Sequence, residues 1–319
     1  MPNLNVAVIG YPEYAKGIGK KSTVSDITFY DAKRGDFTLS LVEPSKYPEK
    51  LSSLFFATSL ADVAIVIVEQ MGPSFGECAI MLDSVGVRKG YIVTKGYITK
   101  DQITSLTKDT VMAGYEFVED DPVRIREELF AVAQRLGPAE AANHGSVPID
   151  HYFDVRGVGT VILGCVADGV VRRHDSVAVH PIGKDAEIRS IQKHDDGFEE
   201  AVKGDRVGLA LKGVTVSELD RGVVLSTDEG LVDRTEISAK AHIVKYWLNQ
   251  LKDGMVVHLG HWMQFEPAKI ESVRSDGDWR NPQLQLKLPK PLTYRPGTRA
   301  VLTYLEGGKL RIIGTLDLA

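Results

Sequence analysis

The sequence predicts a multidomain protein in which an α/β domain is followed by an all-β region. Its 319 residues suggest two or three domains. Residues 1–140 alternate short β-branched runs with segments of helical spacing, a pattern typical of a mostly parallel, doubly wound sheet with helices on both faces. Residues 147–164, VPIDHYFDVRGVGTVILG, have the pattern of a strand, a glycine turn and a second strand.

Short apolar runs place the strands of the first domain, and apolar residues at helical spacing place its helices. Strands are expected at residues 5–10, 26–30, 37–42, 63–68, 91–94 and 115–118, with a hairpin turn around Gly35. Helices are expected at residues 12–19, 48–60 and 74–85, after Thr99, and at 122–136. This order is that of a small nucleotide-binding α/β domain with an antiparallel hairpin after its first strand.

Side-chain caps support three of these helix starts. Ser74 with Glu77 and Thr99 with Gln102 have the spacing of capping boxes. Asp121 precedes Pro122 as an N-cap residue.

Composition excludes several classes of protein. The 43% apolar and 25% charged residues are those of an ordinary soluble protein. No apolar run is long enough to span a membrane, and the first residues lack the features of a signal peptide. Cys78 and Cys165 are far apart and have no partners at metal-binding spacing, so we expect two buried thiols in a cytoplasmic protein.

Composition shifts divide the chain into residues 1–140, 145–234 and 236–319. The clearest linker is the Gly-, Pro- and Ala-rich stretch at 136–146. Residues 236–319 carry 12 basic and 8 acidic residues in an otherwise acidic chain. This balance does not fit a bulk nucleic-acid coat; it fits one RNA held on one face, or ordinary scatter of charge.

The motif at 147–164 resembles the opening of the second domain of translational GTPases, the family of elongation factor Tu and SelB. The resemblance continues through residues 166–181, 188–195 and 203–226. Residues 237–270 and 294–319 are similar to the closing barrel of the same family, most of all to archaeal SelB-like proteins, including the group proposed for pyrrolysine. The resemblance implies a degenerate P-loop GTPase-like domain followed by two β-barrels.

The phosphate-binding loop of that family is altered here. Counting GxxxxGK(S/T) from Gly10 puts Lys16 at the lysine position, but Ala15 and Gly17 replace the last glycine and the Mg²⁺-binding hydroxyl. The alternative interpretation is that the loop is deleted and Lys16 is an ordinary helix residue.

The other two nucleotide motifs are also altered. Only Pro44 remains of Asp-x-Pro-Gly-His, whose catalytic histidine becomes Lys46, and only Lys95 remains of Asn-Lys-x-Asp. GTP and Mg²⁺ are therefore implied by the family alone, and we expect no nucleotide cofactor. No arrangement of residues indicates another enzyme class or a metal site, so no catalytic residue and no metal ligand is assigned.

By position, the resemblance implies a pocket for the aminoacylated end of a tRNA in the second domain. Its candidate residues are Asp150, His151, Phe153, Leu163, Gln192 and His194. Several replace family residues of different chemistry, so the pocket either takes another aminoacyl group or no longer binds tRNA. Basic residues of the third domain that would contact RNA phosphates are Lys287, Lys290, Arg295 and Arg299.

Three functions remain open at this point. The first is a monomeric module that binds aminoacyl-tRNA or another RNA in the cleft between the first and second domains. The second is a scaffold that binds the ribosome or another protein without nucleotide. The third is a GTP-dependent SelB-like factor with an unusual nucleotide site.

Overall fold

The computed structural model describes residues 2–137 and 142–319, so part of the predicted linker lies outside the described residues. The chain forms two compact units. The first runs up to Gly137 and also includes Tyr304–Ile313, and the second contains the described residues from 142 to Thr303 and Gly314–Ala319. Among the described residues, no helix has the length and apolar character needed to cross a membrane.

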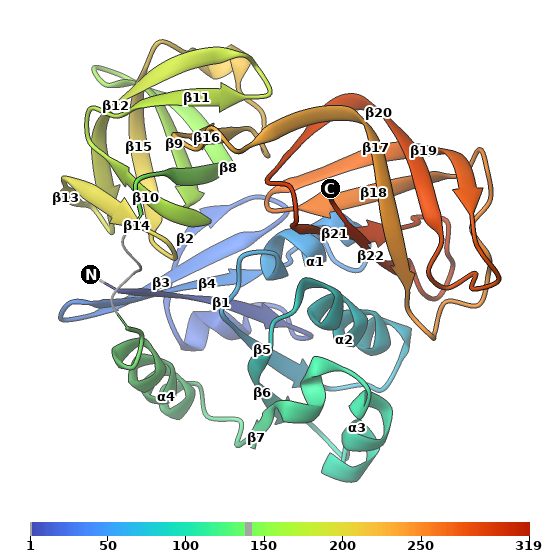
Figure 1. The fold of residues 1–319 in the computed structure, drawn as a ribbon. Helices are drawn as coiled ribbons and strands as arrows, with labels where there is room; N and C mark the ends of the chain where they lie inside the picture. Colours follow the sequence, from blue (N-terminus) through green and yellow to red (C-terminus); the bar gives the residue numbers. More distant parts are fainter. Residues whose placement is uncertain (1, 138–141) are drawn as a thin grey trace. The chain divides into compact units, whose positions relative to one another are not determined.

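The first unit is built on a seven-stranded sheet (Figure 1). In sheet order its strands are β2 (Lys20–Val24), β3 (Thr28–Arg34), β4 (Phe37–Glu43), β1 (Asn3–Ile9), β5 (Val63–Val68), β6 (Lys89–Thr94) and β7 (Glu116–Val118). From β4 to β7 the neighbours are parallel, whereas β2, β3 and β4 are antiparallel. The predicted strands and the hairpin at Gly35 are confirmed.

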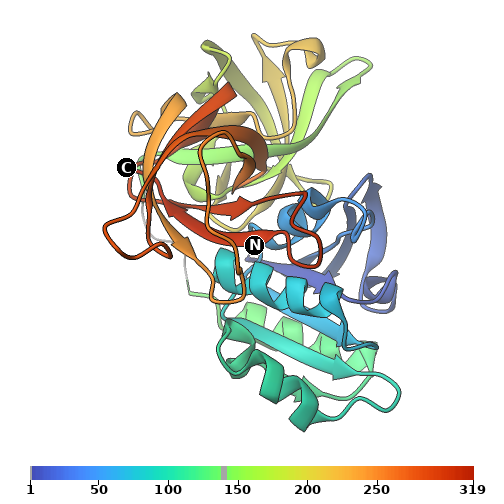
Figure 2. The same cartoon turned by 90° about the vertical axis from the view of Figure 1, so that its right-hand side faces the viewer.

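Helices cover both faces of this sheet (Figures 1 and 2). They are α1 (Leu51–Thr58), α2 (Pro73–Val85), α3 (Lys100–Thr107) and α4 (Pro122–Gln134), with 3₁₀ helices η1 (Tyr14–Gly17) and η2 (Val111–Gly114). α4 and η1 pack on one face of β1 and β4, while α1 and α2 pack together over the other. Every residue of β5, VAIVIV, is buried, as expected for a central parallel strand.

The caps at Thr99 and Asp121 are confirmed, but the capping box at Ser74 is wrong. The carboxylate of Glu77 instead accepts hydrogen bonds from Arg311 Nε at 3.0 Å and from the Tyr47 hydroxyl at 3.1 Å. Arg311 belongs to the Tyr304–Ile313 segment of the first unit, 234 residues away along the chain. Local spacing cannot reveal so distant a partner.

The second unit contains two closed barrels of six strands each. The first barrel runs in the ring order β8 (Gly145–Val155), β16 (Val224–Ser226), β11 (Ser176–His180), β12 (Lys184–Lys193), β15 (Arg206–Lys212) and β9 (Gly159–Cys165), which pairs back to β8. It is extended by β10 (Asp168–Arg172), β13 (Asp196–Phe198), β14 (Glu200–Val202) and the 3₁₀ helix η3 (Val216–Glu218). Aliphatic residues such as Ile149, Ile162 and Leu209 fill its interior.

The second barrel consists of β17 (Val232–Ile243), β20 (Gln283–Tyr294), β19 (Gln264–Arg274), β18 (Val256–His261), β21 (Arg299–Thr303) and β22 (Ile312–Asp317). The boundary placed between residues 234 and 236 falls inside β17. The fold class expected from the sequence, an α/β domain followed by two β-barrels, is confirmed. Both cysteines are buried and form no disulfide, as expected.

Candidate functional site

The loop after β1 occupies the position where a phosphate-binding loop would lie. It begins at Gly10, which has a φ of 95°. An added Cβ there would lie 2.1 Å from the Ile67 carbonyl oxygen, so only glycine permits this close approach of the ends of β1 and β5. The predicted helix at residues 12–19 is reduced to η1, and Glu13 before it is left-handed, with a φ of 58°.

A carboxylate from the same unit binds the amides of this loop. Glu43, the last residue of β4, accepts hydrogen bonds from the backbone N–H of Glu13 at 3.0 Å and of Ala15 at 2.7 Å. The hydroxyl of Tyr30 donates a third, at 3.3 Å. In the register counted from Gly10, both amides lie in the segment that would surround a phosphate. Two amides of this segment are therefore occupied by a side chain of the protein.

The Glu43 carboxylate lies in surroundings of low dielectric constant, and none of its three hydrogen-bond donors is a cation. The residue is 5% exposed, and burial raises the pKa of its carboxyl above the usual range. The two amides and Tyr30 oppose this effect without overcoming it. Amides that converge on one point stabilise an anion, and here the anion is a side chain of the protein.

A cavity of about 620 Å³ opens beside Glu43. Its lining includes Gly10, Pro44, Lys46 and the carboxyl-bearing residues Glu13, Glu43 and Glu69. Pro44, which follows β4, lines this cavity together with Gly10.

Lys16 and Lys95, the two retained lysines, face different surroundings. Lys95 forms an ion pair with Asp120 at 2.7 Å, and its ammonium group lies 4.5 Å from the centre of the Tyr11 ring. Tyr14 donates its hydroxyl hydrogen to the same Asp120, at 2.9 Å. Lys16 stands in η1 with an exposed side chain and is absent from the lining of the cavity beside Glu43. The structure therefore separates Lys16 from the other retained motif residues.

Three of the predicted pocket residues form one row across the first barrel. His151 pairs with Leu163, Leu163 with Gly208, and Gly208 with Gln192, on β8, β9, β15 and β12 respectively. Their neighbours along the strands point into the core, so this row lies on the outer face. Phe153 lies two residues along on β8 and is 40% exposed.

Gly208 keeps this row shallow at its centre. Its φ is not in the left-handed region, and an added Cβ would meet only ordinary contacts, 3.4 Å from Leu163 Cδ2 and 4.0 Å from Gln192 Cβ. Glycine is therefore not required here by the backbone. Its absent side chain leaves room between Leu163 and Gln192 for another group.

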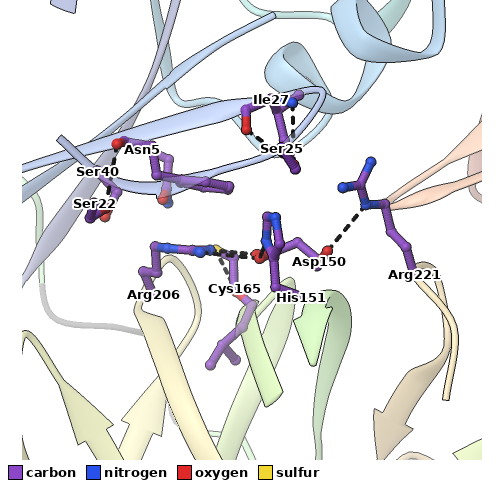
Figure 3. Close-up of polar contacts among 12 residues, drawn as sticks. Asn5, Ser22, Ser25, Ile27, Ser40, Asp150, His151, Cys165, Arg206 and Arg221 are labelled. Atoms are coloured by element: carbon purple, nitrogen blue, oxygen red, sulfur yellow. Dashed lines mark hydrogen bonds and ion pairs between the residues drawn. The ribbon is translucent and has the colours of Figure 1, made fainter. Parts of the chain in front are cut away.

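Asp150 lies next to this row at a β-bulge in β8 but is buried (Figure 3). Its carboxylate is bound by both terminal nitrogens of Arg206, one of them at 3.1 Å, and it contacts His151 Nδ1 at 2.6 Å. Arg221 Nε donates to the Asp150 backbone carbonyl at 3.1 Å. Asp150 thus holds the orientation of the His151 ring.

Burial alone would raise the pKa of Asp150, but the charge of Arg206 and the hydrogen bonds from His151 and Arg206 outweigh it. The net effect lowers the pKa to about 2. Asp150 is therefore ionised, and Arg206 balances its charge within the barrel. His194 stands in the turn between β12 and β13 with a φ of 49°, outside the row.

The basic residues predicted to contact RNA are unequally engaged. Arg295 binds the carboxylates of Asp228 and, at 3.2 Å, Asp168, whereas Lys290 and Arg299 each form an exposed ion pair, at 3.3 and 3.1 Å. Exposed pairs of this kind are weak and exchange readily. Lys287 is exposed on β20.

Sequence reasoning missed Glu43, Arg206 and Gly208. Glu43 occupies the variable position of its motif, although its place at a strand end beside the first loop was a usable signal. Arg206 and Gly208 lie within a recognised family segment, but only strand register brings them to Asp150 and Leu163. Within residues 2–137 and 142–319, no group of three potential metal ligands gathers.

Comparisons with known proteins agree with this architecture. The family model described as elongation factor Tu domain 2 matches residues 159–226. An uncharacterized protein of Methanocaldococcus jannaschii is 36% identical over 318 residues, which cover 98% of this chain and 99% of the relative. The selenocysteine-specific elongation factor of the same organism is 26% identical over 79% of this chain, and the match spans 58% of that relative's length.

Solved structures show the same fold. Translation elongation factor SelB of Methanococcus maripaludis, in complex with the GTP analogue GppNHp, aligns with a TM-score of 0.79 at 23% identity, over 100% of this chain and 79% of that chain. A bacterial selenocysteine-specific elongation factor aligns with a TM-score of 0.80 at 19% identity, over 100% of this chain and 58% of that one. The chain therefore belongs to the same family as the 36% identical Methanocaldococcus jannaschii protein. The elongation factor Tu domain 2 match and the selenocysteine-specific relative place that family in the SelB-like translation elongation factor superfamily, whose fold the solved structures share.

Proposed function

We propose that this protein binds aminoacyl-tRNA, or another RNA end, on the outer face of its first barrel, without a GTP cycle. The observation that carries the proposal is the row of His151, Leu163, Gly208 and Gln192 on a barrel of the elongation factor Tu domain 2 type. We take the exposed ring of Phe153 and the imidazole of His151 as the surfaces that stack on bases or pack on an aminoacyl side chain.

The chemistry of the row suits a partner different from that of its relatives. The acidic residue implied by the family, Asp150, is neutralised by Arg206 and is not exposed to attract a cationic group. His151 and Gln192 offer hydrogen-bonding groups, and the gap at Gly208 admits an apolar or planar group against Leu163. A neutral or polar aminoacyl group fits these surroundings better than a charged one.

The absence of a GTP cycle is supported by the fit of the residues to the nucleotide. A bound triphosphate needs the loop amides, yet Glu13 and Ala15 donate theirs to Glu43. The Glu43 carboxylate adds negative charge where phosphates would lie, and Gly17 provides no hydroxyl for Mg²⁺. The residues at this position therefore do not fit GTP and Mg²⁺.

Filter binding with matched aminoacylated and deacylated tRNA tests the proposal. We expect tighter binding of the aminoacylated form, and we expect Gly208→Val to remove that preference because valine fills the centre of the row. Gln192→Ala should weaken binding, whereas the matched control Gln134→Ala, exposed at the end of α4, should not. Equal binding of both tRNA forms by the unaltered protein would contradict the proposal.

Titration with a fluorescent GTP analogue tests the second half of the proposal. We expect no saturation below millimolar concentration. Micromolar affinity would instead favour the GTP-dependent alternative.

A further inference from the structure

A second cavity, of about 430 Å³, opens on the first unit and has a different electrostatic character. Five cationic side chains line it: Lys16, Lys20, Lys33, Arg34 and Arg126. Asp31 is the one carboxyl-bearing residue of its lining. The cavity beside Glu43, in contrast, is lined by three glutamates and two lysines.

Glycine contacts hold the lysines of η1 and β2 beside this cavity. An added Cβ at Gly17 would lie 2.8 Å from Pro122 Cβ, and one at Gly19 would lie 2.9 Å from the Asp31 carbonyl oxygen. The backbone between Lys16 and Lys20 is therefore pressed against both α4 and β3. The tight packing of this segment fixes the backbone positions of Lys16 and Lys20.

The positive charge of this cavity is poorly neutralised by the protein. Arg34 pairs with Glu127 and lies over the Phe130 ring, with 4.3 Å from its guanidinium carbon to the ring centre. Within the described part of the chain, no carboxylate lies within salt-bridge distance of Lys16, Lys20 or Arg126. Three clustered cations that have no carboxylate partner attract a polyanion.

We propose that this cationic cavity binds the phosphate backbone of RNA. Four of its five cations are exposed and come from η1, β2 and β3, and the fifth, Arg126 on α4, is half-buried. A site for one small anion needs buried donors that converge on a point, whereas dispersed exposed cations suit a string of phosphates. The partner class rests on the proposed function, but the site is separate from the barrel row.

The test measures binding of a short single-stranded oligouridylate, which carries no aminoacyl group, by fluorescence anisotropy across a salt series. Removing two phosphate contacts in Lys16→Gln/Lys20→Gln should reduce the slope of log K against log salt by about 1.4. The control Lys50→Gln/Lys108→Gln removes the same charge from exposed positions outside the cavity and should leave the slope unchanged. Arg126→Gln provides an independent variant on α4, with half that reduction.

Equal slopes for test and control variants would overturn the inference, as would failure of the unaltered protein to bind the oligonucleotide. Displacement of RNA by micromolar inorganic triphosphate would also overturn it, because that result assigns the cavity to a small anion. These outcomes are distinct from failure of the proposed function, which is measured by the preference for aminoacylated over deacylated tRNA.

Discussion

Glu43 in the α/β domain and Asp150 in the first barrel are both buried carboxylates, yet their pKa values shift in opposite directions. Glu43 is held by two amides and a tyrosine hydroxyl, and its pKa is raised. Asp150 is held by the guanidinium of Arg206 and by His151, and its pKa falls to about 2. The comparison teaches that the neutral donors around Glu43 do not offset the effect of burial on its pKa, whereas the positive charge of Arg206 helps to outweigh that effect at Asp150.

The two carboxylates also lie next to sites of different availability. Glu43 occupies the loop amides themselves, so the site is filled from within the chain. Asp150 is withdrawn below the barrel face and leaves the row of His151, Leu163 and Gln192 at the surface. The same kind of residue therefore closes one candidate site and supports the other.

Removing Arg206, the cation that pairs with Asp150, should have the largest effect on stability. In Arg206→Met, Asp150 is left buried without its main counter-charge, so we expect a loss of about 3 kcal/mol of unfolding free energy. Urea unfolding measures this loss. The control Arg173→Met breaks an exposed pair with Glu199 in the same domain and should change stability by less than about 1 kcal/mol. Equal losses in both variants would show that burial of the pair does not set its effect on stability.

Removing the Glu43 carboxylate should lower the unfolding free energy by less than Arg206→Met does. It should also create a site that binds an external anion. Glu43→Ala leaves the amides of Glu13 and Ala15 without an acceptor, so we expect a loss of about 2 kcal/mol of unfolding free energy. Phosphate or sulfate should then stabilise this variant more than the unaltered protein, because the amides can bind an external anion. Thermal unfolding with and without phosphate measures this difference. If phosphate stabilises both proteins equally, Glu43 does not occupy the anion position.

The pH dependence of stability should differ in sign between the two residues. Because the pKa of Asp150 is depressed from 3.8 to about 2, its contribution is present above the unfolded pKa and is lost as pH falls through this window. The loss is about 2 kcal/mol and should appear as a shrinking difference between the unaltered protein and Asp150→Asn.

Glu43, with a raised pKa, should show the opposite and smaller trend. Its contribution is present below its unfolded pKa of 4.5 and declines as pH rises through the folded value. The difference between the unaltered protein and Glu43→Gln should therefore become less favourable to the unaltered protein with rising pH. A parallel trend for both residues would show that the charge of the partner is not the deciding factor.

Predictions from short segments were confirmed where the cause of the structure was local. The caps at Thr99 and Asp121 and the buried run of β5 depend on residues a few positions apart. Ser74 with Glu77 had the same local pattern but failed, because Arg311 supplies a stronger partner through two charge-assisted hydrogen bonds. Local spacing competes with tertiary contacts and yields where the tertiary partner carries a charge.

By itself, the sequence determined the α/β domain, the two barrels and the family, since alternating apolar periods and glycine turns are properties of contiguous segments. It also named most residues of the barrel row, but it did not show that they form a row. Tertiary structure alone decided that Glu43 fills the loop amides, that Arg206 neutralises Asp150 and that Lys16 joins a separate cationic cavity. Each of these depends on strands and helices distant in the chain coming together, and the energy of a buried charge is set by what surrounds it in space.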